Sequence, residues 1–306
     1  MNFMTTKTRN WLLMLCIVVL PFLTFAGFIV SDFLTPPPLP PLPNPNGYDD
    51  FVKAGKMVVV NLKINTTFYD DMNETQLQEV VSTNVAALAL ARAGLSNQCA
   101  VPVQYSEIWS NHLSDLASLK FLAQAFLAEG KLAEMENRPN VAAKSYLDVI
   151  HLGNESARGG VLIDQLVGIA IEATGTSHLT NLLTRLDAKS CRECAATLEN
   201  LDSQRQTLDE VMQQENDWSR RTFPGVRNEI ARLKTRKSLQ AGQAATARKF
   251  MQQQVRTRQL IIDLAARAYE LDKGKPSASL ADLVPDYLKA VPQDSFTGTN
   301  MVYSPR

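Results

Sequence analysis

Apolar side chains recur at helical spacing through most of the chain after residue 70. Between residues 75 and 95 they fall on one side of a helix that Gly94 closes, at Leu77, Val80, Val81, Val85 and Leu88. Between residues 107 and 136 the same period places Ile108, Leu113, Leu116, Leu119, Leu122 and Phe126. A third helix is expected from a cap at Asn140 through Leu152, with Gly153 as its stop. The pattern predicts a mainly α fold.

The second half of the chain predicts two long helices. From Thr176 to Phe223 there is neither Gly nor Pro, and Pro224-Gly225 then breaks the run. After that break only Gly242 interrupts helix-compatible sequence before Gly274. We therefore expect a long antiparallel helical hairpin with arms at about residues 190–222 and 226–273.

The strongest single signal is an apolar run near the start. From Trp11 to Ser31 no side chain is charged, and about 20 residues at 1.5 Å rise span roughly 30 Å, the thickness of a bilayer core. Lys7 and Arg9 precede the run, and acidic residues follow it, which predicts a cytoplasmic N-terminus. The alternative is a cleaved signal peptide with a site near Thr24-Phe25-Ala26. The run continues beyond that site, which favours an uncleaved transmembrane anchor.

A proline-rich segment follows the predicted anchor. Seven of the ten residues from Pro36 to Pro45 are proline, so this stretch favours extended polyproline geometry. It is expected to act as a semi-rigid spacer. A proline-rich ligand for an aromatic groove is the alternative, although readers of that kind are mostly cytosolic.

These segments give a domain organisation for a single-pass protein of the inner membrane whose larger part is periplasmic or otherwise extracytoplasmic. The expected boundaries are residues 1–10 for a cytoplasmic N-terminus, 11–34 for the anchor, 35–46 for the spacer, 47–189 for a helical domain, 190–273 for the hairpin and 274–306 for a small α/β tail.

Charge is balanced over the whole chain but not along it. There are 31 Lys and Arg against 31 Asp and Glu, whereas residues 220–258 carry eleven basic side chains and one acid, for a net charge of +10. The first arm of the hairpin is acidic, so pairing between the arms is one explanation. The other is a surface for an anionic partner such as a phosphate-bearing envelope polymer, lipid headgroups or an acidic protein. The candidate contacts are Arg227, Arg232, Lys234, Arg236, Lys237, Arg248 and Lys249.

Nucleic acid is not expected at this basic segment, because base stacking needs several aromatic side chains and Phe250 stands alone beside the stretch from Lys234 to Lys249.

Two carboxylates interrupt the helix expected from Val161 to Ala173, which is apolar on nearly all sides. Asp164 and Glu172 should therefore be buried, and a buried carboxylate either pairs with a cation or has a perturbed pKa suited to chemistry. We expect ion pairs with Arg92, Arg158 or Arg185. An envelope hydrolase built on the two carboxylates is the enzymatic alternative, but no convergent base, nucleophile or metal ligand accompanies them in the sequence.

The cysteines and histidines give no clear site. Cys16 lies in the predicted anchor, and Cys191 and Cys194 share an apolar helical seam with Leu198 and Leu201, which indicates core packing. A disulfide or redox role for this C-x-x-C pair, or a metal site, is the alternative. Cys99 makes the exported count odd, so at least one thiol should be free. The three histidines are isolated in the sequence and are interpreted as surface or core imidazoles: His112, His151 and His178.

Three resemblances add to these patterns. Gly130, Ala133, Asn137, Ala142, Tyr146 and Val149 fall where a tetratricopeptide unit places its packing residues, although one unit does not make a repeat array. The tail resembles the soluble end of the type II secretion major pseudopilin (G-type), through the segment Tyr269 to Gly274, Val291-Pro292, Asp294 and Tyr303. The residues themselves predict a Pro- and Gly-punctuated turn that leads into one or two small strands near Met301 to Tyr303, and the resemblance implies a small sheet in the tail. Through the proline spacer, the glycine-bounded helix that begins Gly159-Gly160-Val161-Leu162-Ile163-Asp164 and this tail, the whole chain also resembles an uncharacterised class of membrane-anchored proteins typical of planctomycete-type bacteria.

Composition agrees with a folded protein, since 45% of residues are hydrophobic and 20% are charged. No cofactor motif, metal motif or small-molecule substrate site is evident. The sequence favours a non-enzymatic interaction or scaffold component of the cell envelope. The alternatives are an accessory of a type II secretion or pilus-like system and, less favoured, the hydrolase.

Overall fold

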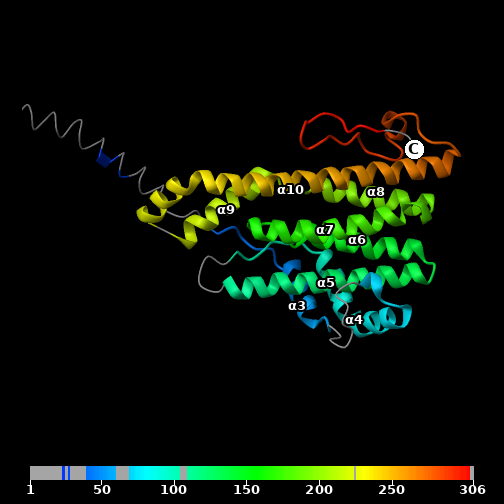
Figure 1. The fold of residues 1–306 in the computed structure, drawn as a ribbon, viewed down its shortest axis with the longest axis horizontal. Helices are drawn as coiled ribbons and strands as arrows, with labels where there is room; N and C mark the ends of the chain where they lie inside the picture. The colour runs from blue at the N-terminus through cyan, green and yellow to red at the C-terminus, as the bar shows by residue number, and fades with distance from the viewer. Residues whose placement is uncertain are drawn as a thin grey trace, which may run out of the picture.

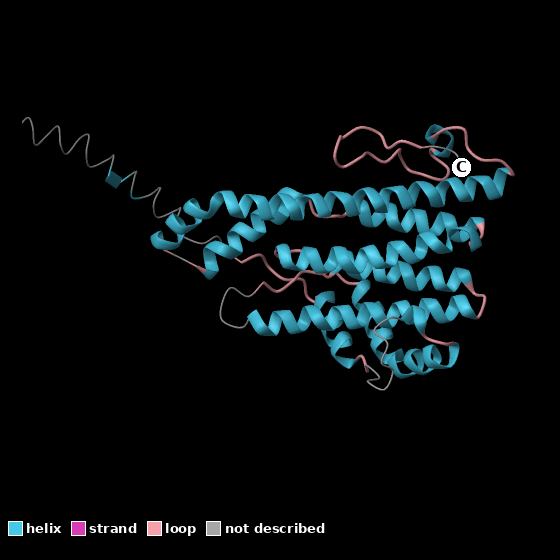
Figure 2. Cartoon of the chain, viewed as in Figure 1, coloured by secondary structure: helices cyan, strands magenta, loops and turns pink. Residues whose placement is uncertain are grey.

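A computed structural model describes residues 23, 24, 27, 39–59, 69–103, 109–223 and 225–303, without the side chains of 70, 109, 110, 226–233 and 235–241. The described part contains eight α-helices and no β-strand (Figure 2). Their bounds are α3 Gly47–Met57, α4 Glu74–Leu95, α5 Trp109–Met135, α6 Pro139–Glu155, α7 Leu162–Leu182, α8 Ala188–Ser203, α9 Leu208–Thr222 and α10 Val226–Lys273. Three short 3₁₀ helices are η2 Tyr69–Asp71, η3 Leu183–Arg185 and η4 Leu280–Leu283. The mainly α prediction is confirmed.

From α5 to α8 each helix lies antiparallel to the one before it, in a stack that is longest along the helix axes, whereas α9 continues in the direction of α8 (Figure 1). α3 and α4 form one side, α5, α6 and α7 the middle, and α8 with the second half of α10 the other side. One continuous apolar core runs from Tyr48 in α3 to Met301 in the tail. A smaller cluster around Met72, Leu77 and Leu132 joins α4 to α5.

The predicted helices before residue 190 are present, with three local differences. Val85, expected on the inner side of α4, is 58% exposed, because the buried position beside it is taken by Asn84, whose Oδ1 accepts from the Val59 amide at 2.8 Å. α6 begins at Pro139 with Arg138 as its cap, so Asn140 does not cap it. Pro suits this first helical position because its missing N–H would have no partner there.

Gly153 does not end α6, and this is the third difference. The helix continues through it to Glu155, and a Cβ at Gly153 would lie 2.6 Å from the backbone nitrogen of Glu172 in α7. A Cβ at Gly168 would lie 2.4 Å from the Gly153 oxygen. The two glycines therefore allow the backbones of α6 and α7 to approach closely, and they position α7 in the centre of the stack.

The long hairpin is present, but its first arm is two helices. α10 covers the predicted second arm, whereas the first arm is broken between Ser203 and Leu208. The break contains no Gly or Pro; Thr207 caps α9 through a capping box with Glu210, and Arg205 turns inward to bond Glu172. α9 and the first part of α10 extend beyond the ends of α5, α6 and α7 (Figure 1). We call this part the α9–α10 hairpin.

The tail has the predicted helix stop and short helix but lacks the predicted strands. α10 ends at Gly274 with φ of +69°, and Ser279 precedes η4. Up to Tyr303 the described tail holds a single antiparallel bridge, between Gln293 and Asn300, where strands near residues 301–303 were expected. Too few consecutive backbone pairs meet there to make a sheet. The α/β description of the tail is therefore wrong for the described residues.

The predicted anchor, residues 11–34, lies almost wholly outside the described residues, as does the first part of the spacer. Within the described ranges, none of the helices has the length and apolarity needed to cross a bilayer.

Candidate functional site

Asp164 is enclosed where α7 begins. The residue is 1% exposed, with Oδ2 accepting from the Val161 amide at 2.8 Å and Oδ1 lying 2.7 Å from Nε2 of His112 in α5. Burial lowers the pKa of His112, but the hydrogen bond and the charge of Asp164 outweigh that effect and raise it. The expected arginine partner is wrong: the side chain that faces Asp164 is the imidazole of His112.

Glu172 is enclosed in the same helix, two turns further on. Arg205 donates to it through both terminal nitrogens, with Nη1 to Oε2 at 3.0 Å, and the Thr257 hydroxyl donates to Oε1 at 2.8 Å. The side chains of Glu172 and Arg205 are 1% and 8% exposed. An ion pair was expected, but Arg92, Arg158 and Arg185 were the wrong candidates.

Little space remains around Glu172 for a substrate. The cavity between it, Arg205 and Arg158 holds about 10 Å³, room for about one water molecule. Both carboxylates bond fixed partners across the core, and this arrangement is typical of buried charges that hold helices together.

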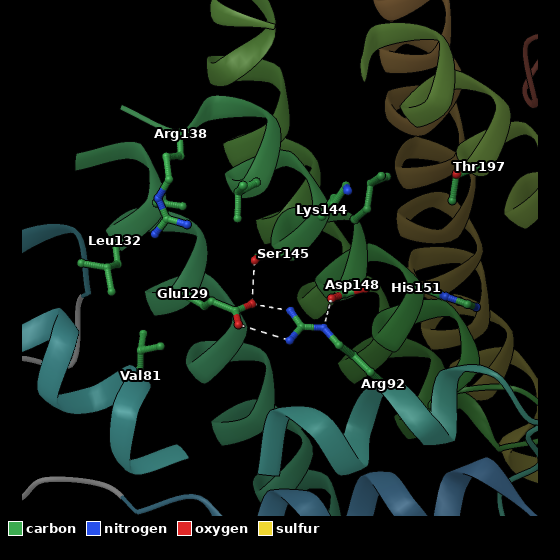
Figure 3. A pocket seen from close by; sticks show the side chains of 13 residues that line it. Val81, Arg92, Glu129, Leu132, Arg138, Lys144, Ser145, Asp148, His151 and Thr197 are labelled. Carbon is green, nitrogen blue, oxygen red and sulfur yellow. Dashed lines mark hydrogen bonds and ion pairs between the residues drawn. The ribbon is translucent and has the colours of Figure 1, made fainter. Parts of the chain in front are cut away.

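A larger hollow opens between α4, α5, α6 and α8 (Figure 3). Its volume is about 570 Å³, within the range of ligand sites. Its walls combine apolar side chains such as Val81, Leu132 and Leu147 with several charged ones. We call it the α4–α6 hollow.

Arg92 from α4 lies at the centre of the α4–α6 hollow. It donates to both carboxylate oxygens of Glu129 in α5 and, through Nε, to Oδ2 of Asp148 in α6 at 2.7 Å (Figure 3). Ser145 adds a hydrogen bond to Glu129 at 2.7 Å. The network joins three helices and consists of charge-assisted bonds, which are stronger than neutral ones.

The electrostatics of the α4–α6 hollow suit binding better than proton transfer. Burial raises the pKa of Asp148 although Arg92 opposes the shift, and burial lowers the pKa of His151, which is therefore neutral at pH 7. Exposed cations at Arg138 and Lys144 stand at the edge of the hollow. The carboxylates of Glu129 and Asp148 are already hydrogen-bonded to Arg92. The wall of the hollow could therefore contact a ligand through its apolar side chains and through polar groups that are held in place.

Sequence reasoning missed the Arg92 network and the His112–Asp164 pair. A signal for His112 was present, because it stands four residues before Leu116 and seven before Leu119, in the apolar stripe of α5. Glu129 in α5 and Asp148 in α6 are acidic residues within helices that otherwise pack through apolar side chains. Their shared partner is 37 and 56 residues away and could not be read from spacing.

The basic residues expected to contact an anionic partner all belong to α10. Lys234, Arg248 and Lys249 are exposed. The side chains of Arg227, Arg232, Arg236 and Lys237 lie outside the described set, although their backbone is helical. The structure therefore puts the described members on the solvent side of the same long helix.

The cysteine pair lies in the core. Cys191 and Cys194 are buried in α8 with Leu198 and Leu201, and both thiols are free, as is buried Cys99. The predicted apolar seam is confirmed. In the described ranges no three His, Cys, Asp or Glu side chains are grouped so that they could hold a metal ion.

Comparison with known proteins places the chain in no family. No protein-family model matches it, and searches of curated proteins and of solved structures find no similar protein.

Proposed function

We propose that the chain is a membrane-anchored extracytoplasmic protein that serves as a non-enzymatic interaction or scaffold component of the cell envelope. The apolar run at residues 11–34 would hold it in the bilayer, and the proline-rich spacer would separate the helical body from the surface. The main support for the proposal is that the α9–α10 hairpin extends beyond the helical stack (Figure 1) and contains most of the basic segment.

The hairpin has the character of a contact surface. Val211 is the one residue of α9 that is buried, so the body holds this helix by few apolar contacts. Lys234, Arg248 and Lys249 are exposed on α10. A net charge of +10 over residues 220–258 then favours an anionic partner, whether a phosphate-bearing polymer, a lipid headgroup or an acidic protein.

The alternative, neutralisation by the acidic first arm, has less support from the contacts. Asp202 pairs with Arg205 and with Arg258, so one ion pair joins the first arm to the end of the basic segment. Glu215 instead accepts from the Leu162 amide at 2.9 Å. Glu199 accepts from the backbone of Lys289 at 2.9 Å. Two of these three acids, Glu215 and Glu199, are therefore bonded to backbone amides away from the exposed basic residues.

The hydrolase alternative loses support from the enclosure of Asp164 and Glu172, each 1% exposed. A general acid or base must reach the proton that it transfers in a bound substrate. The accessory role in a type II secretion or pilus-like system depends on the tail resemblance alone, and unaltered secretion in a deletion strain would contradict it.

Crosslinking in intact cells, followed by mass-spectrometric identification of neighbours, tests the proposal. The informative variant combines Lys234→Glu, Arg248→Glu and Lys249→Glu. A matched control reverses three exposed lysines elsewhere, with Lys53→Glu, Lys189→Glu and Lys275→Glu.

We expect the first variant to lose its anionic neighbours and the control to keep them. Equal neighbour sets for the wild type and both variants would contradict the role of the hairpin. Recovery of the intact chain from the soluble fraction, with none in alkali-washed membranes, would contradict the anchor.

A further inference from the structure

Four exposed cations lie along one side of α10. We call them the basic stripe, and they are Lys234, Arg248, Lys249 and Arg256. At about 3.6 residues per turn, all four fall within a sector of about 100° around the helix. Lys234 and Arg256 are 22 residues apart, so the stripe is about 33 Å long. The charges therefore form a row on one face and do not surround the helix.

Acidic side chains are separated from the basic stripe. The sequence has no Asp or Glu from residue 230 to residue 262, and both Glu229 and the Arg258 that pairs with Asp202 lie outside the sector of the stripe. In the part of the chain that the structure describes, none of the four stripe residues forms a salt bridge. A row of like charges repels itself, so an extended anionic surface would stabilise it.

The spacer leads to the end of the body from which the α9–α10 hairpin projects. Residues 39–46 run from α3 toward that end of the stack (Figure 1). The predicted anchor ends at residue 34, and the five residues from there to residue 39 can span at most about 18 Å. A bilayer that holds the anchor would therefore lie close to residue 39, at the end of the stack where the hairpin is.

The tip of the hairpin adds aromatic surface. Phe223, directly after α9, is 51% exposed, and its ring meets that of Trp218 edge-on with centroids 6.2 Å apart. Tryptophan is enriched at the level of lipid headgroups, where its ring is partly in water and partly in apolar surroundings. Basic and aromatic side chains on one element are typical of helices that lie on a bilayer surface.

We propose that the basic stripe docks on anionic phospholipid headgroups of the bilayer that holds the chain's own anchor. The spacer keeps the stripe near that surface, so docking takes place at a high effective concentration. Each Lys or Arg beside an anionic leaflet favours docking by about fivefold. This docking rests on the proposed function and selects lipid as its anionic partner.

Fluorescence quenching by spin-labelled headgroups tests the docking in the full-length chain. The chain is reconstituted in nanodiscs of phosphatidylcholine that include a headgroup-spin-labelled lipid, with or without replacement of a third of the phosphatidylcholine by phosphatidylglycerol. The fluorophore is attached at Ala245→Cys, an exposed position in the sector of the stripe, in a Cys16→Ser background. The other cysteines are buried. Ala196→Cys, exposed in α8, carries the fluorophore in the control.

We expect phosphatidylglycerol to increase quenching at residue 245 and to leave quenching at residue 196 unchanged. Raising the salt concentration from about 0.1 M to about 1 M should reverse the increase, because the Debye length falls from about 10 Å to about 3 Å.

A matched pair of variants separates the stripe from the net charge, since both lose four positive charges at exposed positions. The stripe variant combines Lys234→Gln, Arg248→Gln, Lys249→Gln and Arg256→Gln. The control variant combines Lys53→Gln, Lys189→Gln, Lys275→Gln and Lys289→Gln. The stripe variant should lower the ratio of docked to undocked chains at least about tenfold, and the control should lower it less than about twofold. The far-ultraviolet circular dichroism spectrum of both should be unchanged, because glutamine favours helix as lysine and arginine do.

Equal quenching at residue 245 with and without phosphatidylglycerol would overturn the docking, as would equal quenching in the stripe variant and the control variant. A chain that stays in the discs without this quenching would keep its anchor and leave the proposed function intact. Crosslinks in cells that depend on the stripe and lead to a protein or a polymer would then identify a different partner. A chain that does not enter the discs would contradict the anchor and the docking together.

Discussion

Arg205 and Glu172 form a two-pronged ion pair between the α8–α9 turn and the centre of α7. Burial lowers the pKa of Arg205, but the charge and hydrogen bonds of Glu172 raise it by more, so the guanidinium stays charged in the core. Because Thr257 of α10 donates to the same carboxylate, one pair fixes three elements relative to one another. The break between α8 and α9 is thus held from inside the body.

Arg205→Met should therefore destabilise the protein by about 3–5 kcal/mol, since it leaves Glu172 charged and buried without its cation. Urea unfolding followed by circular dichroism measures this change. Arg138→Met is the matched control: its ion pair with Glu136 is 52% exposed on the arginine side and should cost at most about 1 kcal/mol. Adding Glu172→Leu to Arg205→Met should restore most of the lost stability. Equal losses for Arg205 and Arg138 would contradict the structural weight given to the buried pair.

The helices could be predicted because the spacing of apolar residues is a property of a short stretch of sequence. The partners of Glu172 could not be predicted in this way. Leu77, Leu88 and Leu119 repeat at helical spacing and are buried. Glu172, by contrast, meets an arginine 33 residues away in a turn whose sequence has no Gly or Pro. A turn that depends on one inward side chain leaves no mark in the hydrophobic pattern. The position of this break was therefore missed while α10 was predicted to the residue.

Gly168→Ala should destabilise the α6–α7 contact. The added Cβ would lie 2.4 Å from the Gly153 oxygen, and because the clash is with backbone, the helices must separate. Overpacking of this kind costs about 1–3 kcal/mol or more. Gly242→Ala in α10 is the control with the opposite sign: nothing lies within 4 Å of its added Cβ, so it should stabilise the helix by about 0.5–1 kcal/mol. Thermal unfolding of both variants distinguishes these outcomes, and a stabilised Gly168→Ala would contradict the close approach.

The pH dependence of stability should differ between two histidines. The pKa of His112 is raised above its ordinary value in the folded chain, so its pair with Asp164 stabilises fully below about pH 6.5 and is lost as pH rises through the raised value. The pKa of His151 is lowered by burial, so this group costs stability as pH falls below about 6.5.

Unfolding free energies of His112→Gln and His151→Gln between pH 5 and pH 8 check these opposite signs. Relative to the wild type, the loss in His112→Gln should be largest at pH 5 and shrink toward pH 8. The unfolding free energy of His151→Gln should increase relative to that of the wild type as pH falls. Parallel curves for the wild type and His112→Gln would show that the imidazole is not linked to Asp164 in solution.

The candidate site was less predictable than the fold for a similar reason. Arg92 was named as a partner, but its carboxylates were not, since Glu129 and Asp148 approach it only when α4, α5 and α6 are packed together. The α4–α6 hollow likewise depends on how the helices pack together. The excess of basic residues in 220–258 could be predicted, because it needs only a count of charges along the sequence. The exposure of Lys234, Arg248 and Lys249 agrees with a basic surface there.

The thiols of Cys191 and Cys194 should be unreactive in the native protein. Burial raises their pKa to about 11 and about 12, and the thiolate is the nucleophile in alkylation, so at pH 8 reaction should be at least about a hundredfold slower than for an ordinary thiol. Iodoacetamide labelling with peptide mass spectrometry, before and after unfolding, measures this ratio in a Cys16→Ser background. Ala196→Cys, at an exposed position of the same helix, provides a thiol that should react at once. Native labelling of Cys191 as fast as that control, or loss of both thiols to a disulfide without added oxidant, would contradict core packing and return the pair to a redox role.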